Sequence, residues 1–405
     1  MSKKKIFNDP VYGFISVPYG ILFQLVEHPT FQRLRRIKQL SLTHYVYPGA
    51  LHTRFHHALG ALHLMRQAIR TLQEKGVKIT DEEAEAVQIA ILLHDVGHGP
   101  FSHTLEHTLI NVTHEELSTW FMEQLNHEFD GALSMAISIF QNQYHKHFLH
   151  QLVSGQLDMD RMDYLTRDSF FTGVYEGVIG YDRIIKMLSV KDDELVVEEK
   201  GIYSIEKFLI ARRLMYWQVY LHKTVLSAEQ MLVRTLQRAK TLARNGKAVE
   251  ASKSLHYFLH FDLEGEDLQK EKHTLLQHFA SLDDFDVVAA LKAWQNNEDD
   301  ILSYLASSLI NRKLFKLSFQ KEAPSGLQLS ALQKGIQEKF PHIVEADKYF
   351  LIKGKETNRT YSTAKEEIKI LLKNEEVQPL SKISDYEIQN RIVAKNFLCY
   401  PKKVQ

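Results

Sequence analysis

The chain has 405 residues, and its 44% hydrophobic and 25% charged residues are ordinary for a globular protein with a large domain and a smaller appended region. Its 50 basic and 50 acidic residues cancel, so no global basic field favours nucleic acid as a partner. The single cysteine, Cys399, excludes an intrachain disulfide bond and any thiolate metal cluster.

Most of residues 20–310 has the apolar spacing of helices. Residues 54–75 repeat apolar side chains at intervals of three and four and predict one helix. Residues 81–95 open with acidic side chains, which favour a helix N-terminus because of the helix dipole. Near its end the second segment has the apolar run IAILL at 89–93, directly before His94 and Asp95, and this run predicts a helix that is buried at its C-terminal end.

The segment that follows this helix gathers polar groups. HDVGHGPFSH, at 94–103, holds three histidines, one aspartate and two glycines. Gly97 predicts a left-handed helix cap, Gly99 and Pro100 predict a break, and Ser102 predicts the cap of the next helix. Polar groups at the end of a buried helix need partners, and a metal ion is one good partner.

In the second half of the chain the pattern of apolar and polar residues changes twice. Residues 192–204 predict a β-hairpin with Lys200 and Gly201 at its turn, and one long helix is expected over 205–245. From about 310 onwards, LFKLSF, KYFLIK, IKILLK and RIVAKNFLCY predict strands separated by polar loops. The predicted fold is therefore mainly α, with a helical core over 1–310 and a smaller α+β region over 311–405.

No membrane segment or secretion signal is expected. The chain begins with three lysines but lacks the apolar stretch of a signal peptide, and it contains no run of about 18 apolar residues. The cytoplasm is the expected location.

Four side chains stand out as candidate metal ligands: His57, His94, Asp95 and Asp160. Imidazole nitrogen and carboxylate oxygen suit one divalent ion such as Mn, Fe, Zn, Ni, Co or Mg. Two histidines and two aspartates leave coordination positions for water and a phosphate oxygen, as catalysis requires. A His-Asp pair alone is a weak signal, because most such pairs are core or surface residues; the glycine break after this pair strengthens the metal interpretation.

The full pattern is more specific than the pair. It comprises RFHH at 54–57, HDVGHGPFSH at 94–103, THE at 113–115 and DMDRMDYLTRD at 158–168. In these motifs the chain resembles the HD-domain metal-dependent phosphohydrolases, and most closely the deoxynucleoside triphosphate triphosphohydrolases, which include the SAM-and-HD-domain enzyme and dGTPase-like bacterial relatives. The resemblance covers roughly residues 6–240, so the HD core is expected to begin without a preceding SAM domain.

The resemblance implies roles for individual residues. It implies four metal ligands: His57, His94, Asp95 and Asp160. It implies catalytic roles beside the scissile phosphate for His98, His103, Glu106 and His114, with His103 as proton donor and Glu106 orienting a histidine. It implies substrate contacts by Gln39, Arg54, Arg161, Tyr164, Asp168, Arg212 and Tyr220.

The implied substrate contacts make physical sense. A triphosphate carries about four negative charges near neutral pH, so three arginines and a cation suit it. Gln39 and Asp168 match groups that hold the sugar 3′-hydroxyl, and Tyr164 matches the ring that packs against the deoxyribose. A histidine whose pKa is about 6.5 can deliver a proton to the leaving oxygen. The expected reaction converts a dNTP and water into a deoxynucleoside and triphosphate, with Mg carried by the substrate as a further cation.

Several positions depart from the family pattern. Glu106 stands where the family often has Asp, and Arg161 where the best-known relative has Lys, so both keep their charge. His28 replaces an Asp that reads guanine in an activator site, which leaves nucleotide activation open. Tyr216 and Leu221 replace pocket residues of that relative, so base preference does not carry over.

Two other functions stay open at this stage. One is a phosphatase acting on nucleoside monophosphates or other small phosphate esters. The other is a nucleotide or nucleic-acid sensor that uses the HD shell for binding, although no ligand or catalytic histidine is lost. A deoxynucleotide substrate and a homo-oligomer, at least a dimer, are the expected partners.

Overall fold

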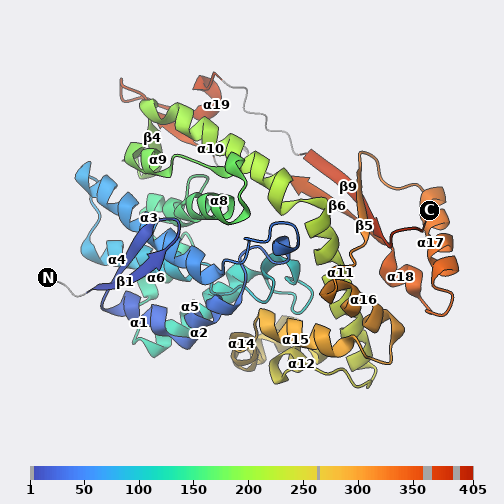
Figure 1. Cartoon of the computed structure of the whole chain (residues 1–405). Coiled ribbons are helices and arrows are strands. Elements are labelled where there is room, and N and C mark those ends of the chain that lie inside the picture. The colour runs from blue at the N-terminus through green and yellow to red at the C-terminus, as the bar shows by residue number, and fades with distance from the viewer. Residues whose placement is uncertain (1–3, 262–264, 359–366, 386–392, 405) are drawn as a thin grey trace.

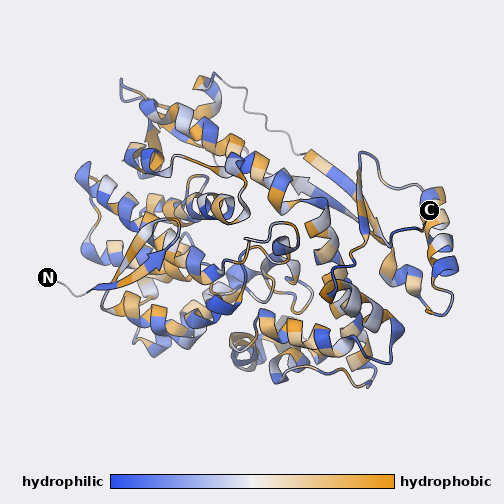
Figure 2. Ribbon diagram, in the orientation of Figure 1, coloured by the Kyte–Doolittle hydropathy of each residue, from blue (hydrophilic) through white to orange (hydrophobic). Residues whose placement is uncertain are grey.

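The computed structural model describes residues 4–261, 265–358, 367–385 and 393–404. Helices dominate it, with small sheets at the periphery (Figure 1), and this confirms the mainly α class with a smaller C-terminal α+β region. In Figure 2 most helices carry both hydrophobic and hydrophilic residues, as expected where one face is buried. In the ranges that the structure describes, every helix is too short or too polar to cross a bilayer.

The N-terminal half consists of one β-hairpin followed by a group of packed helices. The hairpin consists of β1 (Lys4–Asp9) and β2 (Gly13–Pro18). The helices that follow are α1 (Ile21–Glu27), α2 (Pro29–Gln32), α3 (Arg54–Glu74), α4 (Asp81–Leu93), α5 (His114–Glu128), α6 (Ser134–Phe140), α7 (His147–Ser154), α8 (Met159–Thr172) and α9 (Tyr181–Met187). Helix α3 is central, because it packs against both α4 and α8. A capping box of Thr80 and Glu83 starts α4.

The turn after α4 differs from the sequence-based prediction. Gly97 does not adopt the left-handed conformation of a helix cap. Instead it lies against α5, where a Cβ atom would clash with the carbonyl oxygen of His114 and the amide of Ser118. The Gly97 amide donates to the Ser118 hydroxyl over 2.9 Å, and that hydroxyl donates to the carbonyl of His94 over 2.7 Å. The close approach of this turn to α5, rather than a left-handed backbone conformation, therefore requires glycine here.

The next helix also starts later than expected. Ser102 belongs to a single 3₁₀ turn, η3 (Ser102–Thr104), and caps no α-helix. Helix α5 begins only at His114, where Thr113 accepts a hydrogen bond from the Glu116 amide. The stretch between them, residues 105–113, forms a loop that carries the candidate catalytic residue Glu106.

The predicted hairpin is present, but its turn lies elsewhere. Strands β3 (Leu188–Lys191) and β4 (Glu194–Glu198) are joined at Asp192 and Asp193, which have φ of 52° and 61°. Two consecutive residues with positive φ suit a two-residue hairpin turn, and aspartate tolerates that conformation. Lys200 and Gly201, the predicted turn, fall in the 3₁₀ turn η5 (Glu199–Gly201).

The predicted long helix over 205–245 is interrupted. The structure has α10 (Ile202–Met215), a π-helical turn η6 (Tyr216–Tyr220) and α11 (Lys223–Arg244). The π-helical turn widens the backbone where three aromatic residues occur in five positions, and such turns are frequent at functional sites. After α11 come α12 (Lys253–His260), α13 (Gly265–Lys270), α14 (Lys272–Ala280), α15 (Asp284–Trp294) and α16 (Asp300–Ile310).

The C-terminal region divides between two sheets. Strands β5 (Lys316–Gln320), β9 (Val393–Tyr400) and β6 (Ile352–Asn358) form an antiparallel sheet beside α11 (Figure 1). Strand β7 (Lys369–Leu371) instead pairs in parallel with β4 of the core hairpin, and β8 (Val377–Pro379) extends that sheet. The remaining helices are α17 (Gly326–Lys339), α18 (Ala346–Phe350) and α19 (Leu380–Ile383). The C-terminal region is thus joined to the core at two separate places.

Candidate metal centre and active-site cavity

Three helices bring the candidate metal ligands together. His57 lies in the first turns of α3, His94 and Asp95 directly follow α4, and Asp160 lies in the first turn of α8. The Nε2 atoms of His57 and His94 are 3.3 Å apart. Asp160 Oδ1 lies 3.1 Å from the first of these nitrogens and 3.6 Å from the second. Asp95 places one oxygen 3.6 Å from His57 Nε2 and the other 3.4 Å from His94 Nε2.

These distances and the ring orientations fit a divalent ion. Ligand atoms that share an ion about 2.1 Å away lie about 3 to 3.5 Å from one another. His57 donates from Nδ1 to Asp163 over 2.7 Å, and His94 donates from Nδ1 to the Ile91 carbonyl over 2.6 Å. In the neutral rings both Nε2 atoms therefore carry lone pairs that face each other and the carboxylates. Such an arrangement of acceptors is repulsive unless a cation lies between them.

The electrostatics of the cluster also favour a cation. Burial lowers the pKa of His57, but the carboxylates of Asp160 and Asp163 outweigh it and raise that pKa to about 10. Burial raises the pKa of Asp160, yet hydrogen bonds from the two histidines hold it below its ordinary value. The same negative potential that favours a proton on the imidazole favours a metal ion.

Two arginines adjoin the cluster. Arg54 forms an ion pair with Asp95 and donates from Nε to the Ser102 hydroxyl over 2.7 Å. Asp158 caps α8 by accepting from the Arg161 amide over 2.7 Å, and it also pairs with the Arg161 guanidinium. Asp158 is therefore a cap and an arginine partner, whereas Asp163 orients the His57 ring.

Three histidines gather beside the metal cluster. The rings of His98 and His114 stack with centroids 4.0 Å apart, and His103 approaches both edge-on at 4.7 and 4.9 Å. His98 Nε2 lies 3.2 Å from Asp95. Burial and the nearby Arg54 hold the pKa of His98 well below its ordinary value, so this ring is neutral near pH 7.

Glu106 links two of these histidines. One of its oxygens lies 3.0 Å from His103 Nδ1, and the other lies 2.9 Å from both the backbone amide and Nδ1 of His114. Burial raises the pKa of Glu106, but these hydrogen bonds hold it below the ordinary value. The ionised carboxylate therefore accepts from both rings at Nδ1 and fixes where each Nε2 faces. The side chain of His103 is 65% exposed, so it can reach a ligand at the mouth of the site.

A cavity of about 670 Å³ opens beside these groups. It is lined by three of the four candidate metal ligands, by the three histidines and by all seven candidate substrate residues. His57 and Glu106 do not line it. Three buried polar atoms of residues that line the cavity have no hydrogen-bond partner among the described residues: Gln39 Oε1, Arg161 Nε and Arg212 Nε. Buried polar atoms normally have partners, so the cavity offers hydrogen bonds that a ligand can complete.

Asp168 is held from one side by His52, a residue that the sequence did not single out. His52 is fully buried, stacks on Phe171 with centroids 4.5 Å apart, and places Nε2 2.7 Å from Asp168 Oδ1. Tyr220 donates to the other oxygen of Asp168 over 2.8 Å. His52 has no neighbour in sequence that marks it, and only the tertiary structure reveals the contact.

The activator-site residue that departs from the family has a structural role here. His28 accepts at Nδ1 from the Thr30 amide over 3.3 Å and caps α2. Its Nε2 donates to Glu128 over 3.1 Å. The imidazole is therefore engaged at both nitrogens within the chain.

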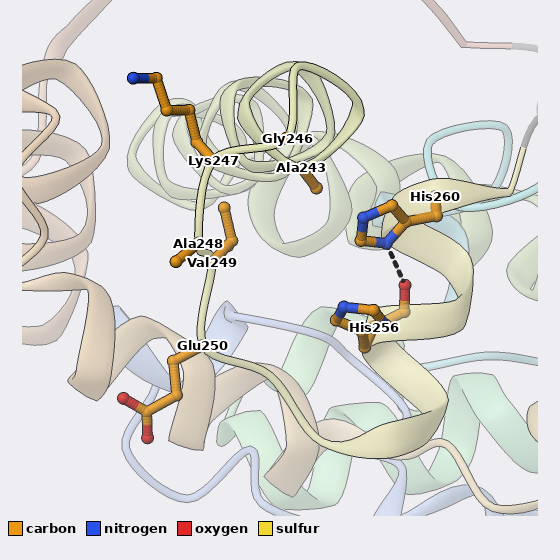
Figure 3. Close-up of a pocket in the computed structure, with 8 residues that line it drawn as sticks. All are labelled: Ala243, Gly246, Lys247, Ala248, Val249, Glu250, His256 and His260. Carbon is orange, nitrogen blue, oxygen red and sulfur yellow. Dashed lines mark hydrogen bonds between the residues drawn. The ribbon is translucent and has the colours of Figure 1, made fainter.

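A second cavity, of about 500 Å³, lies where α11 ends and α12 begins (Figure 3). His260 donates from Nδ1 to the His256 carbonyl over 2.9 Å. Figure 3 shows that Lys247 and Glu250 extend away from these histidines. The side chains that line this cavity do not converge, in contrast to those around the metal cluster.

Known proteins share both the sequence and the fold of this chain. Residues 54–168 match the family model of the HD domain, and residues 179–254 match that of the HD associated region. The chain is 32% identical to the YwfO protein of Bacillus subtilis, an alignment that covers 99% of this chain and 93% of that protein. The chain belongs to the HD-domain phosphohydrolases.

Two further members of the HD-domain group help to place it. A crystal structure of a phosphohydrolase from Bacteroides thetaiotaomicron has a TM-score of 0.94 and 50% identity, covering 99% of this chain and 100% of that chain. The deoxynucleoside triphosphate triphosphohydrolase SAMHD1 homolog of Dictyostelium discoideum is 30% identical, over 62% of this chain and 52% of that protein. This HD-domain protein is thus related to deoxynucleoside triphosphate triphosphohydrolases.

Proposed function

We propose that this protein hydrolyses deoxynucleoside triphosphates to a deoxynucleoside and triphosphate. The observation that carries the proposal is the cavity itself, in which a metal-binding cluster adjoins arginine Nε groups and a glutamine oxygen without partners. A phosphate ester alone would use the cluster and the arginines. The additional sugar-side groups, Gln39, Tyr164 and Asp168, favour a whole nucleotide.

The proposed metal site consists of His57, His94, Asp95 and Asp160. A divalent ion bound there would polarise the phosphoryl oxygen and lower the pKa of a coordinated water molecule. The chain itself supplies the charge that grips the polyphosphate, through Arg54, Arg161 and Arg212. Guanidinium forks suit phosphate oxygens, because several N–H groups point in one direction.

The proton transfers are assigned to the histidines. The oxygen of a water molecule bonds to the α-phosphorus and that water releases one proton, while the bond from phosphorus to the 5′-oxygen breaks and the 5′-oxygen gains one proton as the deoxynucleoside leaves. His103 protonates that oxygen through Nε2, since Glu106 accepts from its Nδ1. His98 and His114 border the phosphorus, and the neutral ring of His98 adds no charge that would hold the product back.

Product analysis tests the proposal. The protein is incubated with each dNTP, NTP and nucleoside monophosphate in the presence of Mn, Mg, Fe or Co, and the products are separated by anion exchange. Release of intact triphosphate from dNTPs supports the proposal. Release of inorganic phosphate from monophosphates would instead identify a phosphatase, and tight binding without turnover would identify a sensor.

A further inference from the structure

One face of α11 also lines the active-site cavity. Leu226, Glu229, Gln230 and Val233 all line it. Their spacing of three, one and three residues places them on one side of the helix. Leu40 and Ser41, directly after the proposed sugar contact Gln39, line the cavity too, and the hydrogen bond between Ser41 and Glu229 places this loop and α11 at the same end of it. This end is therefore where the base of a bound nucleotide would lie.

Glu229 is the carboxyl group at this end. It forms hydrogen bonds with the hydroxyls of Ser41 and Thr104, and those two hydroxyls lie 2.7 Å apart. Because one hydroxyl donates to the other, only one of the two hydroxyl hydrogens remains for Glu229. A carboxylate can accept about four hydrogen bonds, so Glu229 retains acceptor capacity that is directed to the cavity it lines.

The charges along the cavity differ between its ends. Arg161 and Arg212 adjoin the start of α8, where they contact Asp158 and Gln156. Glu356, from β6 of the C-terminal region, lines the cavity and places a second carboxyl group near Glu229. A nucleotide would therefore bind with its polyphosphate toward the arginines and its base toward the two carboxyl groups.

We propose that Glu229 determines base preference by accepting hydrogen bonds from the edge of the base. Guanine presents two adjacent donors, the N1 hydrogen and the 2-amino group, which match the two oxygens of one carboxylate. Thymine presents two carbonyl oxygens with one N–H between them, and these oxygens would face Glu229 and Glu356. Adenine and cytosine each present one amino group beside an acceptor nitrogen. Their affinity for this end of the cavity should therefore lie between those of guanine and thymine. The inference rests on the proposed function for its reading of the cavity as a nucleotide site.

The expected order of preference is dGTP first, dATP and dCTP next, and dTTP last. A site built to hydrogen-bond a donor pair discriminates strongly against a ligand that lacks it, because buried polar groups are left unpaired. We expect a preference for dGTP over dTTP of about tenfold or more, since a bidentate contact to a base carries discrimination of that order. Glu229→Gln replaces one acceptor oxygen by a donor NH₂ group and should reduce this ratio to about threefold or less.

The test measures binding and turnover separately. Dissociation constants for the α,β-imido analogues of dGTP and dTTP are measured by calorimetry with Mn²⁺ at pH 8, where Glu229 is ionised, and kcat/KM for the four natural dNTPs is measured by triphosphate release at the same pH. Wild type, Glu229→Gln and Glu229→Asp are compared, with Glu85→Gln as a matched control because Glu85 is an exposed glutamate on α4. Glu229→Asp keeps the carboxylate and should keep part of the preference.

The outcomes separate the two proposals. A dGTP to dTTP ratio that falls in Glu229→Gln, but not in Glu85→Gln, supports base reading by Glu229. The same fall in the binding ratio without any triphosphate release would keep base reading and reject the proposed reaction. A binding ratio near one in wild type, an unchanged ratio in both Glu229 variants, or no binding of either analogue would overturn base reading.

Discussion

At the scale of single residues, Glu229 should make stability depend on pH. Burial raises its pKa to about 7, against the partial opposition of the hydrogen bonds from Thr104 and Ser41. In the unfolded chain this carboxyl has an ordinary pKa near 4.5. The folded state therefore holds the proton more tightly, and its contribution to stability falls as pH rises through this interval and stays low above about pH 7.

Glu229→Gln cannot ionise and escapes that loss. We expect its melting temperature to exceed that of wild type at pH 8, with a smaller difference at pH 5. Thermal unfolding across pH 5 to 8 measures this, and Glu85→Gln serves as the control. A difference between Glu229→Gln and wild type that is the same at every pH would show that the carboxyl does not titrate in this way.

A second residue-scale prediction concerns the metal cluster. His94→Ala removes one imidazole whose Nε2 faces His57 Nε2 at 3.3 Å. We expect less metal to remain bound after dialysis, because loss of a ligand should lower the affinity for the metal by at least the roughly 10-fold to 100-fold seen for outer partners. Turnover should fall with it. Elemental analysis of the purified protein is the measurement, and His145→Ala, an exposed histidine, is the control.

The proposed contact of Tyr164 with the sugar can be tested in the same way. Tyr164 lines the cavity with its ring 6.1 Å from that of Tyr220, in an edge-on arrangement. If Tyr164 packs where a 2′-hydroxyl would lie, Tyr164→Ala should narrow the preference for a dNTP over the matching NTP. The ratio of kcat/KM for dATP and ATP measures the effect, with Tyr203→Ala, at an exposed position, as control. A ratio that survives the substitution would remove Tyr164 from sugar recognition.

At the scale of elements, Gly97 joins the end of α4 to α5. A Cβ atom there would meet the backbone of His114 and Ser118, which cannot move without shifting α5. Gly97→Ala should therefore cost about 1 to 3 kcal/mol of stability, as overpacking does, and displace the His114 ring. Denaturant unfolding measures the first effect. Gly326→Ala, in α17 with open space around its Cβ position, should leave stability almost unchanged.

The sequence could predict the elements and the ligand types because that information is local. Helical periodicity located α3 and α4 to within a few residues, and the motifs named side chains that the fold brings within contact. Partnerships between distant segments were not predictable. His52 with Asp168, and Arg167 with Asp9 over 2.7 Å, join positions whose separation carries no periodic signal. The π-helical turn at Tyr216–Tyr220 was also missed, because its residues fit an α-helical pattern equally well.

At the scale of the whole molecule, the C-terminal region is tied to the core by more than the chain connection. Strand β7 adds to the core hairpin through β4, and Lys395 of β9 lies 3.7 Å from the ring centroid of Trp217 in η6. Cys399 is buried with its sulfur 3.5 Å from the Ser227 hydroxyl of α11. Glu356 contributes to the cavity wall. The boundary predicted at residue 310 follows a change in the sequence pattern, and several contacts in the structure cross that boundary.

Those contacts predict that the chain unfolds in one cooperative transition. If residues 311–405 formed an independent unit, Mn²⁺ bound at the core cluster would raise the melting temperature of the core alone. If the two regions unfold together, a single calorimetric transition should shift as a whole on adding Mn²⁺, and amides of β7 should gain protection from hydrogen exchange along with those of β4. Two transitions, of which only one responds to the ion, would show that the strand pairing between β4 and β7 contributes little. The same result would make Glu356 dispensable for the cavity, because the region that carries it could then detach without unfolding the metal site.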